Sequence, residues 1–185
     1  MKLYLSSIGI FMVLIGAVNI LVGTESVLYV LVAVVWCTAL QFALDGVIAI
    51  SVRLLPDRLF GIGNPIFRVF GWERRLYKIL GVRRWRDKIW ELGGLGGFSK
   101  AKIDRPRDPE YLEKYIIECN RGVATHTISY GVGFLAMLTL DGVTAFTVAL
   151  PVAVVNLFLN ILPTIVLRFN TPLLKAMLER LQKHS

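Results

Sequence analysis

Two long stretches of the chain contain no lysine or arginine, and these gaps constrain the fold more than any other feature. The first runs from Leu3 to Val52 and the second from Gly122 to Leu167, and both are rich in Leu, Val, Ile, Ala and Phe. The hydrocarbon core of a bilayer is about 30 Å thick, so a helix needs roughly 20 residues to cross it. The pattern therefore predicts an integral membrane protein.

The apolar residues divide into four predicted crossings. The first two, Leu3–Val22 and Leu28–Val52, are joined by a short turn without positive charge. The other two are Thr127–Leu140, which is short, and Val143–Val166. They are joined by a second turn without positive charge, at Asp141-Gly142. We therefore expect an all-α membrane protein with about four transmembrane helices in two hairpins, and a cytosolic interfacial helical region between the hairpins.

The distribution of charge predicts how these segments are oriented. We expect a transmembrane hairpin at 1–52, a cytosolic or interfacial amphipathic region at 53–121, a second transmembrane hairpin at 122–170 and a basic amphipathic tail at 171–185. Of the 21 Lys and Arg residues, 16 lie within 53–121, and neither turn between paired helices has any. The positive-inside rule then places both termini in the cytosol, in a multi-pass protein of the plasma membrane.

The same charge pattern argues against nucleic acid as a partner, although the formal net charge is +8. Basic residues that flank membrane spans set topology and meet anionic headgroups, and they do not form one soluble basic face. Within the central region, Arg74–Gly81 and Trp85–Leu92 are predicted to form short interfacial helices, and Asp108 is predicted to cap a helix that starts at Pro109. The two cysteines form neither a disulfide framework nor a metal-binding spacing, so no metal site is expected.

Ionisable residues near or within the predicted spans are the candidates for chemistry, because such groups are costly at membrane depth. Asp45 lies about two turns from the cytosolic end of its span. It is either a functional residue, as a pocket acid or a partner for an arginine, or a partner in a helix–helix hydrogen bond. Glu118, Arg121 and His126 share one broad helix face within an arc of roughly 140°. They suit proton transfer and the binding of a phosphate or carboxylate. On spacing alone, an interfacial ion pair with a histidine facing the headgroups is the better interpretation.

Asn156 and Asn160 lie one turn apart in the last predicted span, where asparagines commonly join helices. Pro163 loosens the backbone near the cytosolic end, which could open space for a substrate. Arg168 closes this span and would satisfy the positive-inside pattern even without another role.

Three blocks of sequence resemble the family of small membrane acyltransferases typified by glycosyl-4,4'-diaponeurosporenoate acyltransferase. The first block contains Leu55 to Phe60, Trp72-Glu73, Tyr77 and Val82 to Lys88; the second contains Ile116-Ile117-Glu118, Arg121 and His126; the third contains Asn160, Arg168, Phe169, Asn170 and Pro172. Their order and spacing agree over roughly residues 55–175, about two-thirds of the chain.

The resemblance implies acyl transfer from a thioester donor to a hydroxyl group of a membrane glycolipid or carotenoid glycoside. It implies His126 as the base, oriented by Glu118, with Arg121 or Arg168 holding a donor phosphate or the oxyanion. The other residues expected to bind substrate are Glu73, Trp85, Asn160, Asn170 and Asp45. No bound cofactor is expected, and acyl-CoA or an acyl carrier protein would be the co-substrate beside membrane lipids as partners.

Two departures from the family pattern leave a second interpretation open. Val123 stands where the family tends to have an acid, and Thr127 stands where it tends to have tryptophan. The chain could therefore be a non-catalytic lipid- or carotenoid-binding membrane protein on the same scaffold. A third and weaker interpretation is a subunit whose cytosolic region recruits another enzyme.

Overall fold

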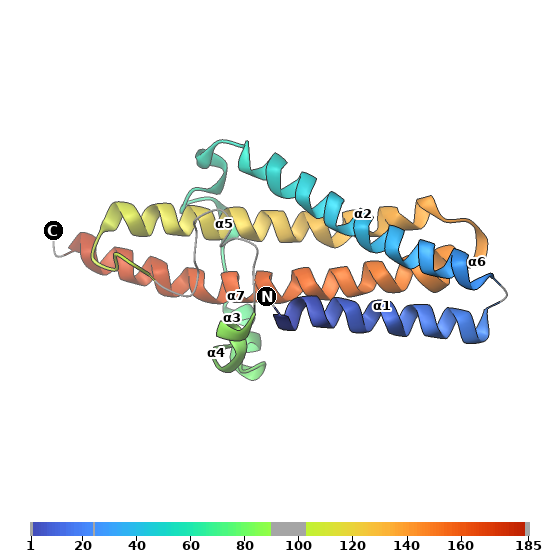
Figure 1. Cartoon of the computed structure of the whole chain (residues 1–185). Coiled ribbons are helices and arrows are strands. Elements are labelled where there is room, and N and C mark those ends of the chain that lie inside the picture. Colours follow the sequence, from blue (N-terminus) through green and yellow to red (C-terminus); the bar gives the residue numbers. More distant parts are fainter. Residues whose placement is uncertain (1, 24, 90–102, 184–185) are drawn as a thin grey trace. The chain divides into compact units, whose positions relative to one another are not determined.

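The computed structural model describes residues 2–23, 25–89 and 103–183, and these are helical over most of their length (Figure 1). Within these ranges there is no strand, which confirms the all-helical prediction. The long helices are α1 (Lys2–Val22), α2 (Val27–Arg53), α5 (Pro109–Val132) and α7 (Leu150–Lys183). The short ones are η1 (Asp57–Phe60), η2 (Pro65–Phe67), α3 (Gly71–Ile79), α4 (Val82–Trp85), η3 (Arg86–Lys88), η5 (Gly133–Thr139), α6 (Gly142–Thr144) and η6 (Ala145–Ala149).

Three helical stretches in the described residues are long and apolar enough to cross a membrane. They are Tyr4–Val22, Val27–Arg53 and Gly142–Lys183. The short crossing predicted at Thr127–Leu140 is not among them, because its residues are divided between the end of α5 and the 3₁₀ helix η5. The structure thus supports a membrane protein, while the count of four crossings and their pairing into hairpins stay predictions.

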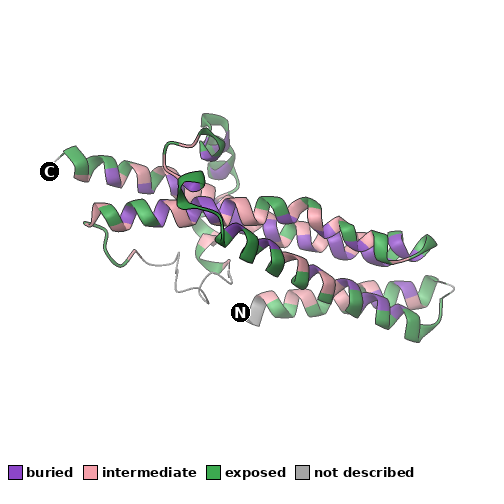
Figure 2. Cartoon of the chain, turned by 90° about the horizontal axis from the view of Figure 1, so that it is seen from above, coloured by how far each residue is buried: buried purple, intermediate pink, exposed green. Residues whose placement is uncertain are grey.

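The outer faces of α1 and α2 carry large apolar side chains that none of the described residues covers. Val13 and Leu21 of α1 are 70% and 83% exposed, and Leu28 and Ile50 of α2 are exposed to a similar degree. Figure 2 shows exposed and half-buried residues along much of both helices. Helices that are apolar all round belong in hydrocarbon, where this surface needs no protein cover.

The chain divides into two compact units, each built from separate stretches of the sequence. Unit 1 contains Met1–Ser51 and Thr127–Ile161, and unit 2 contains Val52–His126 and Leu162–Ser185. Helices α2, α5 and α7 contribute residues to both units.

Small side chains form the packed core of unit 1. Val30, Ala33, Val34 and Cys37 of α2 meet Ala136 of η5 and Val148, Ala149 and Val152 from η6 and α7. Alanines at such contacts let helix backbones approach closely, which is how membrane helices associate without a hydrophobic driving force. Polar side chains add bonds between helices, as in Trp36 Nε1, which donates to Thr139 Oγ1 at 3.0 Å.

Proline explains one of these polar bonds. Pro151 has no N–H to donate to the carbonyl of Thr147, four residues earlier in the same helical stretch. The side chain of Asn19 donates to that carbonyl at 2.8 Å, and it also donates to Ile15 of its own helix. The π-helical turn η6 contains Thr147 and ends two residues before Pro151, so the irregular backbone lies where α1 can satisfy it.

Replacing Asn19 with alanine is expected to lower the free energy of unfolding by about 1–3 kcal/mol, because the Thr147 carbonyl loses its donor. In a Pro151→Ala background the loss should be smaller, since the new N–H can bond that carbonyl. Titration with a denaturing detergent measures both. Equal losses in the two backgrounds would mean that Asn19 does not compensate for the proline.

In unit 2 several local predictions are confirmed and others are corrected. Asp108 accepts a bond from the Tyr111 backbone N–H at 3.1 Å and α5 begins at Pro109, as predicted. The first interfacial helix is α3, displaced three residues toward the N-terminus from the predicted Arg74–Gly81. Gly81 adopts a left-handed conformation (φ +60°) that suits glycine and separates α3 from α4.

Two differences concern helix ends. In place of the second interfacial helix predicted at Trp85–Leu92, the chain forms α4 and η3, and the residues from 90 onward lie outside the described ranges. Helix α7 continues through Pro163. It also continues through Pro172, into the basic amphipathic tail predicted at 171–185. Thr171 donates to the Leu167 carbonyl at 2.9 Å just before Pro172, so a side chain bonds the backbone in this turn.

Candidate functional site

A connecting segment, residues 54–70, is held in unit 2 by side chains that bond its backbone. It contains η1, η2 and irregular turns, so many of its carbonyls have no partner within a regular helix. Arg121 donates to the carbonyl of Leu55 (3.5 Å), Asn120 to Phe60 (2.9 Å), Lys175 to Ile62 (2.7 Å) and Arg168 to Arg68 (2.9 Å). Helices α5 and α7 thus fix the path of this segment between them.

The first group of charges, the Arg121 cluster, consists of Arg53, Asp57, Glu118 and Arg121. The guanidinium of Arg121 donates to Glu118 one turn earlier on α5 and to Asp57 of the connecting segment at 2.5 Å. Arg53 approaches Glu118 at 3.9 Å. The Arg121 guanidinium also lies 5.0 Å from the centre of the Phe60 ring.

Exposure differs sharply within the Arg121 cluster. The side chain of Arg121 is 11% exposed, whereas that of Asp57 is 70% exposed. The Nε–H of Arg121 is buried and has no hydrogen-bond partner. The Asp57 carboxylate is therefore accessible, and the Arg121 side chain behind it is buried and oriented by its bonds to Asp57 and Glu118.

The second group, the Arg168 cluster, consists of Glu73, Tyr77 and Arg168. Arg168 Nε and Nη2 donate to the two carboxylate oxygens of Glu73 at 2.7 and 2.8 Å, which is the two-pronged geometry that arginine favours. The Tyr77 hydroxyl and the Phe70 backbone N–H also donate to Glu73, at 2.8 and 3.0 Å. Glu73 is only 4% exposed, so four bonds satisfy a carboxylate that is almost wholly buried.

These contacts set the ionisation of Glu73 and Tyr77. Burial alone would raise the pKa of Glu73, but the bonds from Arg168, Phe70 and Tyr77 outweigh it and lower the pKa from 4.5 to about 2. Burial and the neighbouring Glu73 carboxylate raise the pKa of Tyr77 to about 12. At neutral pH the tyrosine is therefore a hydrogen-bond donor and the glutamate an acceptor.

The depressed pKa of Glu73 predicts an acid-dependent loss of stability. Above pH 4.5 the carboxylate is ionised in both the folded and the unfolded chain, so its stabilising contribution is fully present. As the pH falls from 4.5 toward 2, the unfolded chain takes up the proton first and the contribution is lost. Unfolding measured between pH 6 and about 2 should show this loss in the wild type and not in Glu73→Gln; identical pH profiles would contradict the assignment.

Two further residues of the resembling blocks meet beside the Arg168 cluster. Arg86 donates to the Asn170 side chain at 2.9 Å, and its guanidinium lies 5.6 Å from the centre of the Phe169 ring. Phe169 and Trp85 pack with Val69, Tyr77 and Val82 in one apolar cluster. Trp85 Nε1 donates to the Leu80 carbonyl at 3.0 Å, so its ring is fixed by the turn that precedes α4.

The structure brings some of the predicted site residues together and separates others. Glu118 and Arg121 are paired, but Arg168 pairs with Glu73 and not with either of them. His126 is half-buried on α5, about 7.5 Å along the helix axis beyond Arg121. Glu118 lies about 12 Å along the axis from His126, and its carboxylate is engaged by Arg121 and approached by Arg53.

The remaining predicted residues, Asp45 and Asn160, belong to unit 1. Asn160 donates to Asp45 at 3.4 Å and to the Asn156 carbonyl at 3.0 Å. Of the two interpretations of Asp45, the helix–helix hydrogen bond is the one that this contact supports. Within the described ranges, no group of three or more His, Cys, Asp or Glu residues is arranged to hold a metal ion.

Sequence reasoning assigned no role to Asp57, Tyr77 and Arg86. All three stand in the resembling blocks, and Tyr77 follows Glu73 by four residues, a spacing that places both on one helix face. Asp57 bonds Arg121, which is 64 residues away along the chain, and Arg86 bonds Asn170, which is 84 residues away. No local pattern indicates these two contacts.

Comparison with known proteins gives one match. A family model described as glycosyl-4,4'-diaponeurosporenoate acyltransferase matches residues 63–180, more than half of the chain. This range includes the whole Arg168 cluster, together with Glu118, Arg121 and His126. Searches of the curated proteins and of the solved structures found no match.

Proposed function

Because the chain belongs to the family of glycosyl-4,4'-diaponeurosporenoate acyltransferases, an acyltransferase family of carotenoid biosynthesis, we propose that it moves a fatty acyl group from a thioester donor to a hydroxyl group of a membrane glycolipid or carotenoid glycoside. One observation supports placing this reaction at particular residues of unit 2. The second and third blocks of family resemblance each contact the first block in unit 2, through Arg121 with Asp57 for the second and through Arg168 with Glu73 and Asn170 with Arg86 for the third.

The reaction joins the hydroxyl oxygen of the acceptor to the acyl carbon and breaks the bond from that carbon to sulfur. The hydroxyl proton passes to a base, and the thiolate that leaves is protonated to a thiol. We assign the base to His126, since a half-buried imidazole can take a proton near neutral pH. Glu118 then serves to position Arg121.

Negative charge develops on the carbonyl oxygen of the thioester as the hydroxyl attacks. Arg168 is the proposed donor to this oxygen, because Glu73 holds its guanidinium rigidly through Nε and Nη2 and leaves Nη1 outside those bonds. Arg121 is the proposed contact for a phosphate of acyl-CoA or of an acyl carrier protein. Glu73, Trp85 and Asn170 shape the same region of unit 2, and a lipid contact of Asn160 and Asp45 in unit 1 stays a separate prediction.

The proposed topology has four crossings with both termini in the cytosol of a plasma-membrane protein. The short crossing gains length from its geometry: the 11 residues of α5 from Gly122 to Val132 rise ~1.5 Å each and the 7 residues of η5 rise ~2.0 Å each, about 30 Å in total. Helix α3 exposes Trp72 and Ile79 beside Arg74, Arg75 and Lys78, which is typical of a helix in the headgroup layer.

One observation favours the second candidate, a non-catalytic lipid- or carotenoid-binding protein. Within each cluster the arginines are matched in number by acids: Arg53 and Arg121 by Asp57 and Glu118, and Arg168 by Glu73. Paired in this way, the charges could serve stability alone.

Release of free thiol from an acyl thioester by the purified protein separates the two candidates. In vesicles that contain the acceptor lipid, the proposed transferase releases thiol at a rate that falls when the acceptor is left out. A lipid-binding protein releases none in either vesicle. Hydrolysis at the same rate with and without acceptor would also contradict the proposal, because the acyl group would then pass to water.

A further inference from the structure

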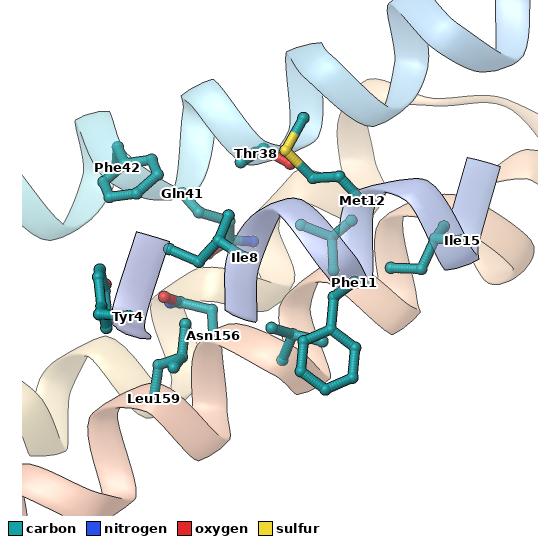
Figure 3. Close-up of a pocket in the computed structure, with 12 residues that line it drawn as sticks. Tyr4, Ile8, Phe11, Met12, Ile15, Thr38, Gln41, Phe42, Asn156 and Leu159 are labelled. Carbon is teal, nitrogen blue, oxygen red and sulfur yellow. The ribbon is translucent and has the colours of Figure 1, made fainter. Parts of the chain in front are cut away.

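A pocket in unit 1 lies among α1, α2 and α7 and is mostly apolar. Its empty space is about 400 Å³, which includes its open side. Figure 3 shows Ile8 and Phe11 of α1 and Leu159 of α7 in its wall, with two amide side chains, Gln41 and Asn156, among them. An apolar wall with few polar groups is characteristic of sites that bind small organic molecules.

The two amides each keep one atom without a hydrogen-bond partner. Gln41 is 4% exposed and Asn156 is 7% exposed. The buried atoms that have no partner are Oε1 of Gln41, an acceptor, and Nδ2 of Asn156, a donor. In hydrocarbon no water reaches such groups, so leaving them unpaired is costly.

The neighbours of each amide determine whether its oxygen or its nitrogen is the atom without a hydrogen-bond partner. Gln41 Nε2 donates to the Gly133 carbonyl at 2.5 Å, and that oxygen could not accept from Oε1. Asn156 Oδ1 accepts from Asn160 Nδ2 at 3.3 Å. A reversal of either amide would place like atoms against each other, so the acceptor of Gln41 and the donor of Asn156 are set by chemistry.

The two atoms lie near one point, beside Gly133 of η5. A Cβ added to Gly133 would be 2.7 Å from Gln41 Oε1 and 3.1 Å from Asn156 Nδ2. A single group that both donates and accepts can therefore satisfy both atoms, and a hydroxyl is the smallest such group. A ketone or ester oxygen would satisfy Asn156 only, and an ionised carboxylate would face the Gln41 oxygen with another acceptor.

We propose that this pocket binds a membrane-borne apolar chain that carries one uncharged hydroxyl group, and that Gln41 and Asn156 together recognise the hydroxyl. The apolar wall holds the chain, Gln41 Oε1 accepts the hydroxyl proton and Asn156 Nδ2 donates to the hydroxyl oxygen. This proposal does not rest on the transferase activity, since neither Gln41 nor Asn156 has a part in the proposed reaction.

Photolabelling of the full-length protein in detergent micelles tests the site. The probes are a long-chain fatty alcohol with a diazirine in its chain and its methyl ether, which keeps the oxygen and loses the donated hydrogen. Wild-type protein should be labelled by the alcohol about tenfold more efficiently than by the ether, the value of one net hydrogen bond. Mass spectrometry should place the label in the peptides of α1, α2 and α7 that line the pocket.

Three variants and one control refine this test. Gln41→Leu and Asn156→Leu should abolish the preference for the alcohol, and Gly133→Ala should weaken it by placing a methyl group against both polar atoms while leaving the amides in place. Thr38→Val is the matched control, because its hydroxyl also lines the pocket but already donates to the Val34 carbonyl at 2.8 Å. It should keep the preference.

The comparison of alcohol with ether in the wild type needs no variant to fold. Equal labelling by the two probes would overturn the proposal and would mean that a buried water satisfies the amides. Label found outside the pocket peptides, or a preference that persists in both leucine variants, would overturn it equally. None of these readouts depends on acyl transfer.

Discussion

Replacing Arg168 with methionine is expected to lower the free energy of unfolding by about 3–5 kcal/mol, the range for breaking a buried ion pair by removing one partner. The loss is large because Glu73 is 4% exposed and would keep a buried charge after its two-pronged partner is gone. Titration with a denaturing detergent in mixed micelles measures the change. The same substitution should remove transferase activity, because the proposed oxyanion donor is lost.

A set of variants distinguishes this ion pair from a general effect of removing charge from α7. Arg180→Met is the matched control, since Arg180 is exposed near the end of the same helix, and it should change stability by no more than about 0.5 kcal/mol. Arg168→Lys should rescue only part of the loss, because an ammonium cannot bond both carboxylate oxygens in the arginine geometry.

The double variant Arg168→Met with Glu73→Gln should be more stable than the sum of the single losses predicts, because no unpaired charge remains buried. If the two losses simply add, Arg168 and Glu73 do not stabilise the chain as a pair, and their ion pair contributes no coupling to the free energy of unfolding.

Replacing His126 with alanine is expected to slow acyl transfer by about 10²–10⁴-fold, the contribution of a positioned general base. Measuring the free energy of unfolding beside the rate distinguishes a loss of catalysis from a loss of folded protein. Thiol release in vesicles that contain acceptor lipid measures the rate, and detergent titration measures stability on the same preparation.

Two comparisons sharpen the histidine experiment. Thr127→Ala changes the exposed next residue of α5 and should leave the rate unchanged. His126→Gln keeps a polar side chain of similar reach that cannot take up a proton near neutral pH, so it should be as slow as alanine. A His126→Gln protein with the wild-type rate would remove the base assignment while leaving the family and the fold intact.

The sequence predicted the features of this chain that depend on local pattern. Apolar runs gave the helices in α1 and α2, and Asp108 followed by Pro109 gave the start of α5. Helix α7 continues through Pro172 although proline removes one backbone hydrogen bond, which the sequence pattern did not indicate.

The pairing of charges could not be predicted in the same way. Periodicity places residues on a face of one helix, but it says nothing about which face of another helix lies opposite. Arg168 and Glu73 are 95 residues apart, and their contact depends on the path of the connecting segment. The family resemblance grouped these residues without pairing them. Arg168 pairs with Glu73, whereas Glu118 and Arg121 pair with each other and also contact Arg53 and Asp57.

The fate of a heavy-isotope acyl chain tests the central claim most directly, namely that unit 2 assembles an acyl-transfer site from three separated parts of the sequence. Purified wild-type protein and Arg168→Met, each in vesicles with a carotenoid glycoside, would receive the labelled acyl thioester, and the lipid extract would be analysed by mass spectrometry. The wild type should yield a labelled glycoside ester, and the variant should yield none. Recovery of all the label as thioester or free fatty acid from the wild type would contradict the account.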